Sequence, residues 1–328
     1  MHRVFATQPL SRESEEKLKA FGTYIRWQGT GPMPESFWLE SAAEADAILT
    51  RGIRIDESLL MHAKRLRVVS TPSVGYDHFD LNAMKRHHVI GTHTPGVLDD
   101  TVADLAMALV LATARRIVEL DGWVRQGRWA QQDATTMFGI DVHHRTIGII
   151  GMGRIGEAVA KRAHYGFGMN VLYYSRTRHA DVEPSIQATY VPFDALLERS
   201  DFVVLLTPLT PETTGLMNQA AFARMKPSAI FINISRGKTV DEEALYRALS
   251  KGQIRAAGLD VFATEPALLD NPLLSLPNVV ATPHIGSATK ATRDEMEHLA
   301  VENVLAILEE RFADARIVPE LQDLAKAL

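Results

Sequence analysis

The sequence predicts an α/β protein with two doubly wound, parallel-sheet domains. Short runs rich in valine, isoleucine and leucine alternate with helical stretches in two series, one within residues 1–100 and one from Thr146 onward. Runs with so little polar alternation are typical of parallel strands that helices cover on both faces. The length of 328 residues also corresponds to about two domains, since domains run to roughly 100–200 residues.

The first series begins with a strand over residues 2–7 and a helix over residues 11–21, for which Ser11 or Ser14 is a plausible N-cap. Further strands are predicted over residues 45–50, 67–72 and 89–95.

The pattern changes at Thr101. Residues 101–127 contain no proline and have an apolar face, which predicts one long helix that ends near Gly127. Thr101 and Asp104 resemble a capping box at its start, with Asp in place of the usual Glu. The polar residues 128–144 show no clear periodicity, and we expect them to form an extended arm.

The second series starts with a strand over residues 146–151 that leads into a helix. Five more strands are predicted at intervals after it, and residues 292–310 form a final helix. The five strands cover residues 170–175, 201–207, 229–235, 256–262 and 278–283.

The composition excludes several classes of protein. The formal net charge of -5 argues against a nucleic-acid or anionic-membrane binder, which carries a basic excess. No cysteine is present, so disulfides, thiolate zinc sites and cysteine nucleophiles are excluded. The N-terminus shows no secretory signal, and no apolar run is long enough to span a bilayer. We expect a cytoplasmic protein that binds neither nucleic acid nor membrane and has no metal site.

A glycine-rich loop follows the first strand of the second series. Gly151, Gly153 and Gly156 have the GxGxxG spacing between an apolar strand and a helix. The first glycine permits the tight turn, the second admits a pyrophosphate to the backbone, and the third lets helix and strand pack closely. N–H groups at the helix start then face the phosphates. A glycine loop alone is weak evidence, but its place between strand and helix predicts a dinucleotide site.

The next strand end distinguishes between two dinucleotides. An acid is usual there, about 20 residues after the loop, where it holds the ribose hydroxyls. Here Ser175, Arg176, Thr177 and Arg178 occupy the interval, and no acid follows until Asp181. An acid repels a 2′-phosphate, whereas arginines can pair with it. The sequence therefore favours NADP(H), with NAD(H) possible; the alternative is that both arginines are simply solvated.

Polar residues follow three later strands of this series. Arg236 comes after one strand, Asp260 and then Glu265 after the next, and His284 after the last. In an open parallel sheet the carboxyl ends of the strands face one crevice, so these residues are directed toward one site. Arginine binds carboxylate and carbonyl oxygens, histidine donates protons near neutral pH, and a carboxylate favours the imidazolium form. The set suits reduction of a 2-keto acid, although each residue alone has a structural explanation.

The chain resembles the D-isomer-specific 2-hydroxyacid dehydrogenase family. The likeness covers nearly the whole sequence and is carried by the segments SVGYDHFD, TPGVLDDTVAD, GIIGMGRIGEAVAKRA, FINISRGKTVDEEAL, AAGLDVFATEP and TPHIGSAT. Within that family it looks most like the bacterial glyoxylate/hydroxypyruvate reductase and 2-ketogluconate reductase branch, through segments such as GIDVHHRTIGIIGMGRIG and AHYGFGMNVLYYSR.

This resemblance implies a Rossmann cofactor domain, residues 101–288, inserted into a flavodoxin-like substrate domain, residues 1–100 and 289–328. It implies reduction of glyoxylate, hydroxypyruvate or 2-ketogluconate to the D-2-hydroxy acid. Arg236 would bind the substrate, His284 would be the acid/base, and Glu265 would support it. Backbone N–H groups of Val74 and Gly75 would help hold the carboxylate. The implied cofactor site comprises Thr101, Gly151, Gly153, Arg154, Ile155, Gly156, Ser175, Arg176, Thr177, Arg178, Thr207, Pro208, Ile234, Ser235, Arg236, Asp260, His284 and Gly286.

The resemblance also implies a homodimer through the cofactor domain, with the helix and arm of about residues 101–142 at the interface. Some relatives place a tryptophan of the arm in the partner's active site. Here Gln131, Gln132, Met137 and Phe138 stand where we would expect it, and Trp129 comes too early. A less bulky pocket would suit a longer sugar acid.

Alternatives remain open. NAD-dependent 3-phosphoglycerate dehydrogenases share the same three site residues but usually have an acid after the second strand. Formate dehydrogenases pair the histidine with glutamine rather than with the glutamate found here. A redox-sensing transcriptional corepressor, which acts as a binding module, can have the same fold and similar residues but tends to have extra disordered tails.

Overall fold

The computed structural model describes residues 1–29, 31–130 and 137–327. They divide into two compact units, which are described separately. One comprises Met1–Leu98 with Thr289–Leu328, and the other comprises Asp99–Ala288.

The first unit contains a five-stranded parallel sheet in the order β2-β1-β3-β4-β5. This is the order of a flavodoxin-like doubly wound fold, in which the direction of winding reverses once. Its strands are β1 (Arg3–Ala6), β2 (Thr23–Arg26), β3 (Ala47–Leu49), β4 (Val68–Ser70) and β5 (Ile90–Thr92). Its helices are α1 (Arg12–Phe21), α2 (Glu35–Glu44), α3 (Glu57–His62), α4 (Leu81–Arg86), α12 (Lys290–Leu308) and α13 (Gln322–Ala327).

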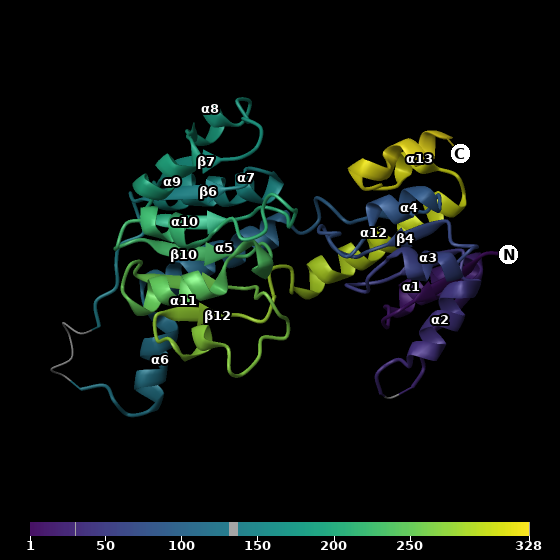
Figure 1. The fold of residues 1–328 in the computed structure, drawn as a ribbon, viewed down its shortest axis with the longest axis horizontal. Coiled ribbons are helices and arrows are strands. Elements are labelled where there is room, and N and C mark those ends of the chain that lie inside the picture. The colour runs from purple at the N-terminus through teal and green to yellow at the C-terminus, as the bar shows by residue number, and fades with distance from the viewer. Residues whose placement is uncertain (30, 131–136, 328) are drawn as a thin grey trace. The chain divides into compact units, whose positions relative to one another are not determined.

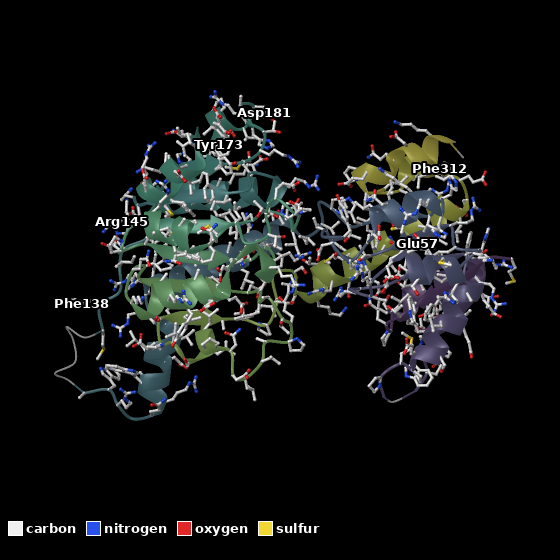
Figure 2. The ribbon with its side chains drawn as sticks, viewed as in Figure 1. Glu57, Phe138, Arg145, Tyr173, Asp181 and Phe312 are labelled. Atoms are coloured by element: carbon white, nitrogen blue, oxygen red, sulfur yellow. The ribbon has the colours of Figure 1, made fainter. Side chains whose placement is uncertain are left out.

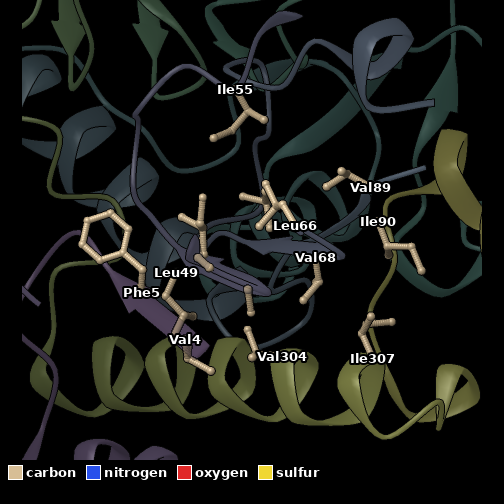
Figure 3. Close-up of a cluster of buried hydrophobic side chains, with 14 of the residues drawn as sticks. Val4, Phe5, Leu49, Ile55, Leu66, Val68, Val89, Ile90, Val304 and Ile307 are labelled. Carbon is tan, nitrogen blue, oxygen red and sulfur yellow. The ribbon is translucent and has the colours of Figure 1, made fainter. Parts of the chain in front are cut away.

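The core of this unit lies between the sheet and α12, which contacts β3, β4 and β5. Figure 3 shows Val304 and Ile307 of α12 directed toward side chains of the sheet. All three residues of β3 and β4 are buried, as expected for strands covered on both faces. The helix that closes this core therefore comes from the far end of the chain. Ser11 is confirmed as the N-cap of α1, because its side chain accepts the N–H of Ser14.

The second unit contains a seven-stranded parallel sheet in the order β12-β11-β10-β9-β6-β7-β8. Counted from β6, this is the Rossmann order, with the winding reversed between β6 and β9. The strands are β6 (Thr146–Ile150), β7 (Asn170–Tyr174), β8 (Thr189–Tyr190), β9 (Phe202–Leu205), β10 (Ile230–Asn233), β11 (Ala256–Leu259) and β12 (Val279–Ala281). The predicted fold class, an α/β protein with two parallel-sheet domains, is confirmed.

Two groups of helices pack on this sheet (Figure 1). α5 (Asp99–Ala114) contacts α7 (Arg154–Lys161) and the strands β10 to β12. The second group contains α9 (Phe193–Arg199), α10 (Gln219–Arg224) and α11 (Glu242–Ser250), each in contact with the next. α6 (Ile117–Arg125) and α8 (Glu183–Ile186) complete the helices of this unit. Among the described residues, no helix is both long enough and apolar enough to cross a membrane.

The prediction of one helix over residues 101–127 is wrong. The chain forms two helices, α5 and α6, and Arg116 between them has a left-handed backbone with φ of 56°. The carbonyl of Ala114, which a continuous helix would pair with residue 118, accepts the N–H of Ile140 instead, at 2.9 Å. A contact from the returning chain therefore competes with the helix at this point.

The predicted capping box of Thr101 and Asp104 is also wrong. Thr101 lies inside the first turn of α5, and Asp104 instead accepts Arg162 Nε at 2.7 Å. α11 is capped by Asp241, whose side chain accepts the N–H of Ala244 at 3.0 Å. The predicted cap fails because α5 begins at Asp99, two residues before Thr101.

Candidate active site

The glycine loop lies at the point where the winding of the second sheet reverses. Gly151 has φ of 104°, and a Cβ there would approach the carbonyl carbon of Leu206 to 2.9 Å. A Cβ on Gly156 would lie 2.4 Å from the carbonyl oxygen of Gly151, so only glycine lets the helix start this close to the strand. A Cβ on Gly153, the N-cap of α7, would meet no atom within 4 Å. This open space beside a helix N-terminus fits a pyrophosphate.

The side chains beside this loop are placed by α5 and α7. Arg154, the first residue of α7, is exposed, and its Nε lies 3.4 Å from a carboxylate oxygen of Asp99. Ile155 is half-buried in the same turn, and Thr101 is half-buried in the first turn of α5. All three residues therefore lie in the first turns of α5 and α7.

Thr207 and Pro208 follow β9, the strand next to β6. The backbone N of Thr207 would lie 3.1 Å from a Cβ on Gly151, so this strand end borders the glycine loop. The hydroxyl of Thr207 is buried and has no hydrogen-bond partner within the described residues. A buried hydroxyl normally finds a partner, so Thr207 is suited to bind a polar group of the cofactor.

The segment after β7 distinguishes its two arginines. Arg178 makes two hydrogen bonds to Glu183, Nε to Oε1 at 2.8 Å and Nη2 to Oε2 at 2.7 Å. The buried Tyr173 donates its hydroxyl to the same carboxylate at 2.7 Å. Hydrogen bonds from Arg178 and Tyr173 lower the pKa of Glu183 to about 2. Arg178 is therefore already paired, through a glutamate that sequence reasoning missed.

Arg176 differs from its neighbour. It is exposed, and in the described part of the chain it forms no hydrogen bond or ion pair. Ser175 donates its hydroxyl to the carbonyl of Thr177, which folds the segment tightly between the two arginines. The segment lies between Tyr173 and Asp181, both labelled in Figure 2. Of the two predicted phosphate ligands, Arg178 is held in an ion pair with Glu183, whereas Arg176 only exerts its charge on Glu212.

Arg236 follows β10 and is half-buried. Its Nη1 donates to the carbonyl of Ser235 at 2.8 Å. Ile234 and Ser235 lie directly before it and are buried. Its charge acts on Glu265, which places the guanidinium near that carboxylate. Arg236 therefore lies close enough to Glu265 for its positive charge to favour the ionised carboxylate.

Glu265 and His284 form a hydrogen-bonded pair. Glu265 Oε2 lies 2.7 Å from His284 Nδ1, and Oε1 accepts the N–H of Phe262 at 3.1 Å. Burial opposes ionisation of Glu265, but the hydrogen bonds from His284 and Phe262 and the charge of Arg236 lower its pKa overall. The His284 side chain is 47% exposed, so its ring remains open to a ligand. A carboxylate that fixes Nδ1 leaves Nε2 for proton transfer.

Asp260 directly follows β11 and is buried. Its carboxylate accepts the N–H of Ile285 at 2.8 Å and the N–H of Gly286 at 2.9 Å. Asp260 therefore binds the backbone of the two residues that directly follow His284. The described residues contain no group of three or more His, Cys, Asp or Glu side chains that could hold a metal ion.

Val74 and Gly75 belong to the first unit, in the loop after β4. The carbonyl of Val74 lies 3.0 Å from Nδ1 of the buried His93, and the carbonyl of Ser73 accepts the N–H of Thr94 at 2.9 Å. The loop is thus held by residues at the end of β5. The predicted arm residues Gln131 and Gln132 lie outside the described residues.

A Rossmann-order sheet with a glycine loop at its reversal point defines a dinucleotide-binding α/β protein. Residues 107–286 match the family model described as D-isomer specific 2-hydroxyacid dehydrogenase, NAD binding domain. The chain is 51% identical to glyoxylate/hydroxypyruvate reductase B of Klebsiella pneumoniae subsp. pneumoniae over 293 residues, which cover 89% of this chain and 91% of that protein. The chain belongs to the D-isomer specific 2-hydroxyacid dehydrogenase family of oxidoreductases.

Two solved structures are similar over almost the whole chain. One is an NADPH-dependent glyoxylate/hydroxypyruvate reductase from Sinorhizobium meliloti in complex with NADP and malonate, with a TM-score of 0.85, 31% identity and 98% coverage of each chain. The other is a D-lactate dehydrogenase from Aquifex aeolicus complexed with NAD and lactic acid, with a TM-score of 0.84 and 29% identity. It covers 95% of this chain and 97% of that chain. Because these neighbours bind different dinucleotides, the fold alone does not decide between NAD and NADP.

Proposed function

We propose that this protein reduces small 2-keto acids to D-2-hydroxy acids, with NADPH as the preferred cofactor. The Glu265–His284 hydrogen bond of 2.7 Å, with the charge of Arg236 close to it, is the observation that carries this proposal. Relatives named as glyoxylate/hydroxypyruvate reductases support it. The substrates we propose are glyoxylate, hydroxypyruvate and 2-ketogluconate.

The roles of the residues follow from their chemistry. The bound nicotinamide cofactor supplies a hydride. The guanidinium of Arg236 binds the carboxylate and carbonyl oxygens of the 2-keto acid and orients it. His284 in its charged form donates a proton from Nε2 to the oxygen that becomes the hydroxyl. Glu265 favours that charged form and fixes the ring through Nδ1. We also propose that the N–H groups of Val74 and Gly75 contribute to carboxylate binding.

The domain assignment is part of this proposal. The unit Asp99–Ala288 would bind the cofactor, and the unit Met1–Leu98 with Thr289–Leu328 would contribute to substrate binding. Measurement of kcat/KM for the three substrates, each with NADPH and with NADH, tests the proposed function. Turnover with none of them would favour the sensor alternative, and NADH-dependent turnover of a phosphorylated hydroxy acid would favour the phosphoglycerate-type alternative.

The cofactor preference predicts different effects for the two arginines after β7. Replacing Arg176 with alanine should raise the Kd for NADPH about 10–100-fold, the usual strength of hydrogen bonds between charged groups. The Kd for NADH should change little, because NADH has no 2′-phosphate. Arg178→Ala should have a smaller effect, since Arg178 is paired with Glu183. Fluorescence titration of both cofactors with each variant measures the Kd values. Equal losses of affinity for NADPH and NADH would show that Arg176 is solvated and does not bind the 2′-phosphate.

Glu265 should set the pH dependence of reduction. Its pKa lies below the usual value, so the carboxylate remains ionised as the pH falls through the mildly acidic range and keeps its negative charge beside His284. Replacing Glu265 with glutamine removes that charge. The alkaline pH at which reduction is lost should therefore move to lower pH in the variant. A pH profile of kcat for both proteins measures the shift, and an unchanged alkaline limb would remove Glu265 from this role.

We further propose a homodimer formed through α6 and the arm. Large apolar side chains on these segments are exposed rather than buried, namely Ile117, Val118, Val124, Trp129 and Phe138. Such an exposed apolar patch is typical of a protein–protein interface. Analytical ultracentrifugation should give twice the chain mass, and a monomer at micromolar concentration would contradict this. The cytoplasmic location stays a prediction.

A further inference from the structure

Two buried polar residues lie at the ends of neighbouring strands, next to the loops that carry Arg236 and His284. Asn233 is the last residue of β10, and Asp260 directly follows β11. Each is 1% exposed. The N–H of Asp260 donates to the carbonyl of Asn233 at 2.9 Å, so the two residues are joined through the backbone. Buried polar side chains are stable only when they form hydrogen bonds, so the partners of these two side chains indicate their role.

Asp260 holds the loop that carries His284. Its Oδ1 accepts the hydroxyl of Thr282 at 2.6 Å and the N–H of Ile285 at 2.8 Å. Its Oδ2 accepts the N–H of Gly286 at 2.9 Å, and its backbone carbonyl accepts the N–H of His284 at 2.9 Å. One residue therefore binds the chain on both sides of the histidine and at the histidine itself.

The backbone of His284 needs this support. Its φ of 52° lies in the left-handed region, which residues with a Cβ seldom adopt. The side chain is half-exposed, so neighbouring atoms cover only part of it. Within the described part of the chain, the ring has one hydrogen bond, from Nδ1 to Glu265. The direction of Nε2 therefore depends on a backbone conformation that the hydrogen bonds of Asp260 maintain.

Asn233 holds the loop that carries Arg236 in the same manner. Its Oδ1 accepts both the N–H of Ser235 at 3.0 Å and the hydroxyl of Ser235 at 2.8 Å. Its Nδ2 donates to the carbonyl of Arg236 at 3.2 Å. The two loops are thus fixed by two side chains whose own backbones are hydrogen-bonded to each other.

We propose that Asp260 and Asn233 are paired positioning residues, which orient His284 and Arg236 relative to one another through the backbone. The inference rests on the proposed roles of His284 and Arg236 in 2-keto acid reduction. It assigns Asp260 a task in the protein itself, different from the place in the cofactor site that the family resemblance implies.

Replacing Asp260 with asparagine tests the pair. The amide of asparagine keeps one oxygen acceptor and replaces the other oxygen with an NH2 donor. That donor would face the N–H of either Gly286 or Ile285, and two donors cannot form a hydrogen bond. We expect kcat to fall about 10–100-fold, the cost of a misplacement of roughly 1 Å, while the Kd for NADPH stays within about twofold. Asp241→Asn is the matched control: Asp241 also accepts a backbone N–H, that of Ala244, but it caps α11 instead.

A double-mutant cycle shows whether Asp260 acts through the histidine. In a His284→Ala background, Asp260→Asn should cause no further loss of kcat, because no imidazole remains to be oriented. An equal loss in both backgrounds would overturn the proposal. So would a rise in the Kd for NADPH that accounts for the whole loss of activity, because that result assigns Asp260 to the cofactor. Thr282→Val removes a single donor and serves as a milder variant if Asp260→Asn does not fold; it should lower kcat several-fold by the same route.

The NMR signals of the His284 imidazole test the positioning role independently of enzyme turnover. The imidazole 1H–15N signals of His284 are identified by their loss in His284→Ala. In Asp260→Asn or Thr282→Val these signals should shift or broaden, and in Asp241→Asn they should not. Unchanged signals in both loop variants would overturn the positioning role. Absence of 2-keto acid turnover in the wild-type protein would reject the proposed function, but the imidazole test would still decide whether Asp260 positions the histidine.

Asn233 gives the complementary pattern. Asn233→Asp keeps the acceptor for Ser235 and loses the amide donor to the carbonyl of Arg236. We expect the KM for the 2-keto acid to rise about tenfold, with the alkaline limb of the pH profile unchanged, because Arg236 binds the substrate and His284 carries the proton. A shifted alkaline limb with unchanged KM would overturn the assignment of Asn233 to Arg236.

Discussion

Replacing His284 with alanine is expected to lower kcat by about 10²–10⁴, the usual contribution of a general acid. The ring is 47% exposed and its Nδ1 is bound to Glu265, so only Nε2 is available to a substrate. Without the imidazole, water must donate the proton to the developing alkoxide. Steady-state kinetics with glyoxylate and NADPH measures the loss.

The same variant should remain folded and bind cofactor. An exposed side chain can be truncated without leaving a cavity in the core, so thermal unfolding should change little. The Kd for NADPH, measured by fluorescence, should also stay close to that of the wild type. A kcat within about fivefold of the wild-type value would remove His284 from proton transfer.

Arg236→Lys is expected to lower kcat/KM about 10²–10³-fold although the positive charge is kept. A guanidinium offers a planar fork that matches a carboxylate and an adjacent carbonyl, whereas an ammonium offers a single point of contact. Arg236 Nη1 is already fixed by the carbonyl of Ser235, which orients the rest of the group. Lysine has no second nitrogen to keep that bond while it binds a substrate.

A conservative change elsewhere is the control for this prediction. Arg224→Lys alters an exposed arginine that pairs with Asp194 and Glu198, away from the carboxyl ends of the strands. Its kinetics should match the wild type. If Arg236→Lys turned over 2-keto acids at a comparable rate, a simple positive charge would suffice, and the forked interaction would be rejected.

Most of the strands that the sequence predicted are buried, although β12, a partly exposed edge strand, was also predicted. All six predicted strands of the second sheet and all four of the first are present. The two that it missed, β2 and β8, lie at the edges of their sheets. An edge strand is covered less completely, and residues of β2 and β8 are accordingly half-buried or exposed. Such strands lack the continuous apolar run by which central strands are recognised.

The sequence also placed the three residues of the proposed catalytic set. Arg236, Glu265 and His284 follow strands that run parallel, and the carboxyl ends of parallel strands meet at one edge of the sheet. The position of each residue relative to its strand therefore indicated their proximity before any coordinates were known. The hydrogen bond between Glu265 and His284 is consistent with that expectation.

The two arginines after β7 show where sequence reasoning ends. By position alone Arg176 and Arg178 look equivalent, and both were predicted to meet a phosphate. The structure pairs Arg178 with Glu183, because the chain folds back over the buried Tyr173 and brings that glutamate to it. Pairing across a loop depends on the path of the backbone, which is not encoded in the local pattern.

The sequence by itself determined the two parallel sheets, the glycine loop and the strand-end residues, because burial on both faces and the parallel sheet leave direct marks in residue order. Tertiary structure alone decided the break between α5 and α6, the ion pair of Arg178, and the hydrogen bonds of Asp260 to the loop that carries His284. Each of these depends on a hydrogen bond between residues whose separation in the chain matches neither the helix period nor the strand period. Such contacts are chosen by competition among donors and acceptors once the chain is folded.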